Sequence, residues 1–273
     1  MANSYVKNKL EQINREGYGL HLEGVLSAAF DIHKKSIIPG FVATLIYVFV
    51  MVVLSLSMFE ARFGMNMTEF VETAQRNPAA IEAAMQNIPF SNMLMFGLAG
   101  AIVGSLIAPL LSGMYKIAFN TQFGANGSVS DLFAYYKSPY FLKIVIFSFL
   151  YSFLLQLINL GLEEALPGLG SLIGVLITIV FGVTFVLVIP FMVFGNLSLA
   201  DSVKASMLVT SKNWFFLLFI LAISFIIVII GVFFCGIGIL FTYPFMYFVT
   251  FVLYDKIIGF PSNVDEISEI GLP

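Results

Sequence analysis

The sequence has few charged residues, and this alone excludes most classes of protein. Only 11% of the 273 residues are charged, against about 25% in a typical soluble domain, and 59% are hydrophobic. A soluble fold needs more polar side chains than this to cover its surface. The soluble, disordered, fibrous and disulfide-stabilised classes are therefore excluded, and the composition predicts a polytopic membrane protein.

Cysteine, histidine and basic residues are also scarce. A single cysteine, Cys235, excludes an intrachain disulfide and a thiolate metal cluster. Two histidines, His21 and His33, are too few for the His-rich metal sites of membrane desaturases and haem oxidases. The 13 Lys and Arg against 16 Asp and Glu leave no basic surface for nucleic acid. We therefore expect no metal site, no cofactor and no nucleic-acid partner.

Uncharged apolar runs of crossing length predict six transmembrane helices. They lie at about 38–59, 93–115, 142–160, 170–195, 213–233 and 237–254. None alternates apolar and polar residues as a membrane β-barrel strand does, so the predicted fold class is all-α. The expected organisation is a segment at 1–21, one six-helix domain at 22–258 with an outer loop at 60–92, and a tail at 259–273.

The distribution of Lys and Arg predicts the orientation of these helices. Eleven of the 13 basic residues lie in the segments 1–37, 116–143, 196–212 and 255–273. The opposite segments carry only Arg62 and Arg76. Because basic residues collect on the cytoplasmic side, we expect both termini in the cytoplasm.

The chain also reads as three copies of one unit. Each copy begins with an acidic residue that is followed by a lysine at the mouth of a crossing, and its second crossing contains a proline. The acid–lysine pairs are Glu23 with Lys35, Asp131 with Lys143 and Asp201 with Lys212, and the prolines are Pro109, Pro190 and Pro244. The acidic segments have helical amphipathic periodicity. We expect three helical hairpins, each preceded by a cytoplasmic amphipathic helix, with the prolines as repeated kinks rather than ion-binding breaks.

Small residues recur every four positions in two of the predicted helices. The two stripes are Gly100, Gly104, Ala108 and Ser112, and Gly170, Gly174, Thr178 and Gly182. Small residues at this spacing let helices approach closely in a membrane. The stripes predict that these two helices meet at the centre of the bundle, and a conduit lined by small residues is the alternative.

Four polar residues near one outer turn form the candidate site, and no catalytic motif accompanies them. They are Gln156, Asn159, Glu163 and Glu164. An interhelical hydrogen bond is the favoured interpretation of Gln156 and Asn159, and a substrate site is the alternative. The sequence contains no Gly-x-Ser-x-Gly, no Walker sequence and no His-Glu-x-x-His, so we expect a protein that is not an enzyme.

The loop 60–92 is the one sizeable loop and is expected outside the cell membrane. Asn77 followed by Pro78 is a favourable start for a helix. We expect two short helices that lie on the outer surface and partly cover the bundle. A lid or a docking surface is a candidate role, but nothing in the loop specifies a ligand.

Several strings in the last third resemble a known family. SLADSVKASMLVTSKNWFFLLF, GVFFCGIGILFTYPF and FVLYDKI are similar to sequences in the YciC-like bacterial inner-membrane proteins. They also resemble the membrane domains that precede some glycerophosphodiester phosphodiesterases. The resemblance covers most of residues 22–258. It implies about six helices and a bacterial cytoplasmic-membrane location, and it carries over no catalytic residue.

The functional expectation is a non-enzymatic membrane scaffold or accessory subunit. Its partners would be the lipid bilayer and other membrane proteins. The alternatives are a transporter or channel for a small or lipidic substrate, and a lipid-modifying enzyme.

Overall fold

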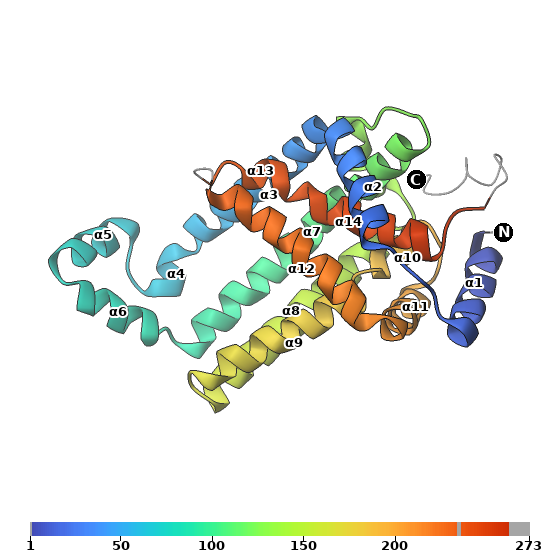
Figure 1. The fold of residues 1–273 in the computed structure, drawn as a ribbon. Coiled ribbons are helices and arrows are strands. Elements are labelled where there is room, and N and C mark those ends of the chain that lie inside the picture. Colours follow the sequence, from blue (N-terminus) through green and yellow to red (C-terminus); the bar gives the residue numbers. More distant parts are fainter. Residues whose placement is uncertain (1, 234–235, 262–273) are drawn as a thin grey trace.

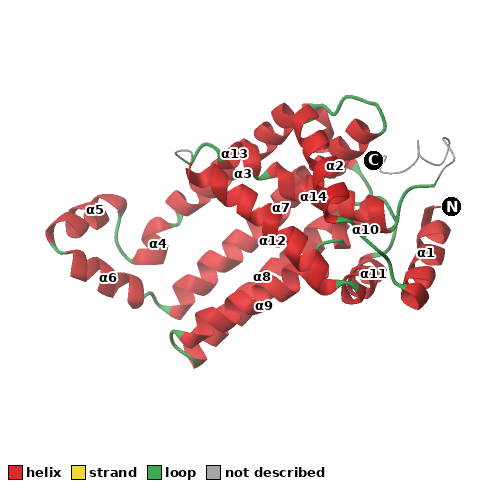
Figure 2. Cartoon of the chain, in the orientation of Figure 1, coloured by secondary structure: helices red, strands yellow, loops and turns green. Residues whose placement is uncertain are grey.

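The fold is helical throughout the described residues. The computed structural model describes residues 2–233 and 236–261, so Cys235 and most of the predicted tail lie outside it. Within that part of the chain no strand is present (Figure 2). The elements in chain order are α1 (Ala2–Glu16), α2 (Leu22–Lys35), α3 (Ile37–Ser57), α4 (Phe59–Phe63), α5 (Met67–Arg76), α6 (Pro78–Gln86), α7 (Phe90–Gln122), the 3-10 helix η1 (Val129–Lys137), α8 (Phe141–Ala165), α9 (Leu169–Phe185), α10 (Val188–Val193), α11 (Leu199–Lys212), α12 (Trp214–Phe233), α13 (Ile239–Thr242) and α14 (Pro244–Ile257).

Within the described residues, five segments are long and apolar enough to cross a membrane, which is consistent with a multi-pass membrane protein. They are Ile37–Ser57, Phe90–Gln122, Phe141–Ala165, Leu169–Val193 and Trp214–Phe233. Each overlaps one of the first five predicted runs. Several extend beyond those runs, because helices continue past the hydrocarbon boundary into the flanking polar residues.

The sixth predicted run does not form one helix of spanning length. It divides at Tyr243 into α13 and α14. The reason is Pro244, which has no N–H for the carbonyl four residues earlier and whose ring crowds that turn. Most of α14 is buried, and it packs against α2, α3, α7 and α12. This segment is therefore the central helix of the molecule (Figure 1).

The three prolines differ in their effect on the helices. Pro109 lies inside α7, which continues through it. Near Pro190 the backbone departs from helical geometry at Leu187 (φ −94°, ψ 1°), so α9 and α10 are separate helices. Helices are thus interrupted near Pro190 and Pro244, where the sequence predicted kinks, whereas the helix around Pro109 is continuous.

Four elements lie together at one end of the long helices, and we call α1, α2, η1 and α11 the basal layer (Figure 1). The elements α2, η1 and α11 directly precede α3, α8 and α12, respectively. Two hydrogen bonds join the N-terminal segment to α11: Tyr18 Oη donates to the Val209 carbonyl (3.1 Å), and Lys212 Nζ donates to the Asn14 carbonyl (2.7 Å). Tyr5 Oη donates to the Ile258 carbonyl just after α14 (3.0 Å).

The densest packing is next to the basal layer. Phe194 and Phe260 lie in contact with the rings of Phe119, Phe251 and Tyr254, with centroid separations between 5.2 and 6.0 Å. In α3 the buried residues are confined to the first two turns, and in α7 most lie in the second half. The far halves of these two helices consequently expose apolar side chains, as lipid-facing helices do.

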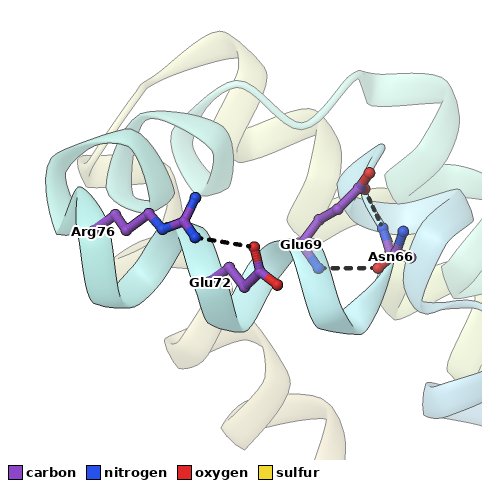
Figure 3. Close-up of polar contacts among 4 residues, drawn as sticks. All are labelled: Asn66, Glu69, Glu72 and Arg76. Atoms are coloured by element: carbon purple, nitrogen blue, oxygen red, sulfur yellow. Dashed lines mark hydrogen bonds and ion pairs between the residues drawn. The ribbon is translucent and has the colours of Figure 1, made fainter.

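The outer loop carries α4, α5 and α6, which project away from the long helices (Figure 1). The two helices predicted here are α5 and α6, and their starts follow from capping. Asn66 and Glu69 form a reciprocal capping box, and Arg76 pairs with Glu72 at 3.7 Å (Figure 3). The expectation that these helices cover the bundle is wrong, because the loop extends beyond the end of α3 and α7 and leaves their sides open.

Candidate functional site

The two polar residues within α8 contact different neighbouring helices. Gln156 lies against Gly97 of α7, where an added Cβ would come within 2.5 Å of its Cγ. Asn159 Nδ2 donates to the Leu155 carbonyl (2.7 Å) and lies 3.4 Å from Thr178 Oγ1 of α9. Its side-chain oxygen occupies the space that a Cβ at Gly174 would need. The residues are engaged on separate helices and do not converge on a common space.

The two glutamates of the candidate site lie at the turn between α8 and α9. Glu163 Oε1 accepts a hydrogen bond from the Gly168 backbone N–H at 3.1 Å, which stabilises the turn. Gly168 has a φ of +79°, a conformation that favours glycine. Glu163 and Glu164 are both exposed. The four candidate residues thus occupy one hairpin, with the glutamates at its solvent-exposed tip.

The small-residue stripes have a different arrangement from the predicted central seam. Both α7 and α9 pack on α8. A Cβ at Gly100, Gly104 or Gly182 would meet no atom within 4 Å, so close packing at these three positions is wrong. Close approach occurs at Gly170, against the Leu162 carbonyl, and at Gly113, against the Leu132 backbone of η1. In the first stripe, Ser112 is buried and donates to the Ala108 carbonyl.

An apolar opening lies between α9 and α12, and we call it the lateral crevice. Its volume is about 420 Å³. Its lining comes from α9, the residue just after α9, α12 and one residue of α14: Thr178, Ile179, Gly182, Val183, Val186, Leu218, Leu221, Ala222, Phe225 and Met246. Two members of the second stripe, Thr178 and Gly182, line the crevice, and Val186 continues their four-residue spacing.

Two Ser-x-x-Asp sequences explain why acidic residues recur before the crossings. Ser128 and Asp131 form a capping box at the start of η1, and Asp131 also accepts from Asn120 of α7 at 3.1 Å. The Ser198 hydroxyl accepts from the Asp201 backbone N–H at 3.1 Å at the start of α11. The sequence interpretation noted the acids but missed the serines three residues earlier, although this spacing is a known helix-start signal.

Among the residues that the structure describes, three buried polar atoms in the basal layer have no hydrogen-bond partner. They are His33 Nδ1, Tyr135 Oη and Ser202 Oγ. The His33 ring lies 5.8 Å from both the Phe245 and Phe248 rings, and burial lowers the pKa of its imidazole. Burial likewise raises the pKa of the Tyr135 hydroxyl. Both shifts favour the neutral form, so neither group carries charge near pH 7.

The part of the chain that the structure describes contains no cluster of side chains that could bind a metal ion. Across residues 2–233 and 236–261, no three His, Cys, Asp or Glu side chains lie close enough together to hold a metal ion. The His21 side chain instead lines a small surface pocket with Lys256 and the start of α2.

Comparison of the chain with known proteins identified no similar protein. No protein-family model, no curated protein and no solved structure matches the chain.

Proposed function

We propose that the chain is a non-enzymatic membrane scaffold or accessory subunit that organises lipid or partner proteins. We further propose six crossings in three repeated units, with α13 and α14 together as the last crossing and the basal layer in the cytoplasm of a bacterial cell. The distribution of basic residues supports this orientation. The relationship to the YciC-like proteins is part of the proposal and rests on the sequence strings alone.

The observation that carries the scaffold proposal is how the polar side chains are used. Gln156 fits against Gly97, and Asn159 bonds to its own helix and approaches Thr178. The Ser206 hydroxyl donates to the Thr184 carbonyl of α9 at 2.7 Å. These groups hold helices together, which is the role expected of polar residues in a structural bundle.

The test compares Gln156→Leu with the unmodified chain in a strain that lacks the native protein. The scaffold proposal expects the variant to restore the cellular phenotype and to retain the lipids and proteins that co-purify in mild detergent. An interhelical hydrogen bond is worth only about 0.6 kcal/mol on average in a membrane, so little stability is lost. Loss of the phenotype with unchanged expression and melting temperature would contradict the scaffold and favour a transporter.

One observation favours a transporter as the second candidate. Helices interrupted within membrane segments supply ligand sites in transporters, and interruptions occur here near Pro190 and Pro244. Cysteines at Thr178 and Val186, in a Cys235→Ser background, distinguish the two proposals. Reaction with a water-soluble maleimide would indicate an aqueous pathway beside the interruption, whereas a scaffold predicts no reaction at either position.

A further inference from the structure

We propose that the lateral crevice binds one acyl chain of a bilayer lipid, taken from the leaflet next to the basal layer. The inference needs only α9 and α12 to be membrane-embedded, and it adds a specific ligand class to the proposed lipid-organising role.

The lining of the crevice has no polar group free to bind a polar ligand. Thr178 contributes the one hydroxyl, and that hydroxyl already donates to the Gly174 carbonyl at 2.8 Å. Its other contact is with Asn159 Nδ2 at 3.4 Å. The deepest residues are Val183 and Leu221, which are 3% and 8% exposed. An apolar ligand therefore loses nothing by entering, whereas a polar ligand would lose its hydrogen bonds.

The crevice exists because two facing residues are small. A Cβ at Gly182 of α9 would meet no atom within 4 Å, and Ala222 of α12 is exposed on the opposite wall. Ile179 and Phe225 flank the opening and are themselves 41% and 56% exposed. Leucine or phenylalanine at either small position would fill this space.

The depth of the crevice corresponds to one lipid leaflet. Trp214 begins α12 and is the kind of residue that lies at a membrane interface. At 1.5 Å per residue, Leu218 is about 6 Å and Phe225 about 17 Å further along the helix. Since half of a hydrocarbon core is about 15 Å, the crevice spans the acyl region of the leaflet on the Trp214 side.

The dimensions of the crevice suit part of one hydrocarbon chain. From Leu218 to Phe225 the crevice is about 10 Å long. Its volume of about 420 Å³ and its apolar lining give an acyl segment room to lie along this length against Val183 and Leu221.

Photo-crosslinking tests the proposal with the full chain in lipid nanodiscs. The probe is a phospholipid that carries a diazirine near the middle of one acyl chain, and the crosslinked residues are mapped by mass spectrometry. We expect crosslinks concentrated on Val183, Leu221 and Met246. Crosslinks to Phe49 and Val53 on α3 give the reference level for non-specific lipid contact, because both side chains are exposed.

Two variants complete the test. Gly182→Leu should reduce crosslinking at Val183 and Leu221 several-fold. Gly104→Leu is the matched control, since Gly104 also faces open space but lies outside the crevice, and it should leave the labelling unchanged. Ala222→Phe blocks the opposite wall and serves if Gly182→Leu does not fold.

Three results would overturn the acyl-chain proposal. They are equal labelling of the crevice and α3, labelling that survives both blocking variants, and crosslinks within the crevice to a second copy of the chain. The scaffold proposal is judged separately by the phenotype of Gln156→Leu, so either proposal can fail while the other stands.

Discussion

At the scale of single residues, the glycines of the membrane helices fall into two groups. Gly113 and Gly170 touch the backbone of a neighbouring segment, where an added Cβ has no space. Gly104 and Gly182 face open space, where the same Cβ meets nothing within 4 Å. Both groups occur within α7 and α9, two predominantly apolar helices, so the composition of the helix does not distinguish them.

Alanine substitution should separate these groups experimentally. Gly113→Ala forces α7 away from the Leu132 backbone of η1 and should cost about 1–3 kcal/mol, as overpacking does in other cores. Gly104→Ala should be neutral or slightly stabilising, because alanine favours the helix. Thermal melting in detergent measures both. Equal losses of stability at the two positions would contradict the packing described for α7.

The sequence predicts which residues are small but not which way they face. Gly100 and Gly104 have the same four-residue spacing as Gly170 and Gly174, yet only the second pair meets a neighbour closely. The direction a stripe faces depends on the rotation of its helix, which contacts far apart in the chain decide. Asn159 Nδ2 lies 3.4 Å from Thr178 Oγ1 of α9, which is the kind of contact that the favoured interpretation expects.

His33 should make stability depend on pH. Burial against Phe245 and Phe248 lowers the pKa of His33 below its ordinary value of 6.5. Below pH 6.5 the unfolded chain therefore binds a proton more readily than the folded chain does. The free energy of unfolding should then decrease as the pH falls through the window below 6.5, and it should not depend on His33 above that window.

Melting temperatures between about pH 8 and pH 5.5 check this expectation. His33→Phe removes the titrating group from its aromatic surroundings and should show a smaller decrease than the unmodified chain. His21→Gln is the matched control, because His21 lies outside this contact and is exposed. If His33→Phe and His21→Gln showed the same decrease, burial of His33 would not be its cause.

At the scale of elements, α11 is fastened to the end of an interrupted helix. The carbonyl of Thr184 lies in the last turn of α9 and accepts the Ser206 hydroxyl at 2.7 Å. Ser206 is fully buried, and Thr210 lies one turn further at 3.3 Å from the same carbonyl. The Ser206 and Thr210 hydroxyls thus donate to a carbonyl in the last turn of α9, which would otherwise have no helical partner. These bonds attach α11 of the basal layer to α9.

Removing this bond should loosen α11 selectively. Ser206→Ala should cost about 1 kcal/mol, which corresponds to roughly fivefold faster amide hydrogen exchange in α11. Ser211→Ala is the control, since the Ser211 hydroxyl bonds within its own helix to Leu208 and is exposed. Identical exchange in the two variants would show that the contact with Thr184 does not hold α11.

The positions of most membrane helices could be predicted from the sequence. The sixth predicted run, 237–254, was expected to be one helix, but it is divided into α13 and α14. Uncharged runs located α3, α8 and α12 to within a few residues, because hydrocarbon thickness fixes their length. Pro244 was expected only to bend its helix, but the chain ends α13 there and begins α14. The burial of α14 at the centre depends on contacts with α2, α3 and α7, which no local pattern records.

At the scale of the whole molecule, the two ends of the bundle are built differently. The basal end is packed by aromatic rings, and hydrogen bonds there join the N-terminal segment to α11 and to Ile258. The opposite end exposes apolar side chains and extends into α5 and α6 (Figure 1). In the proposed orientation the packed end faces the cytoplasm, where most basic residues lie.

Cysteine labelling tests the six-crossing arrangement most directly. In a Cys235→Ser background, single cysteines replace Gln75, Glu164 and Ile237 at the proposed outer turns, and Gln12, Lys137 and Lys256 at the proposed inner side. All six positions are exposed, so a cysteine at each can react in water.

An impermeant maleimide applied to intact spheroplasts should label positions 75, 164 and 237, and it should label 12, 137 and 256 only after permeabilisation. This pattern requires α13 and α14 to return the chain across the membrane. Labelling of position 256 without permeabilisation would leave five crossings, and labelling of position 12 or 137 would reverse the orientation of the molecule.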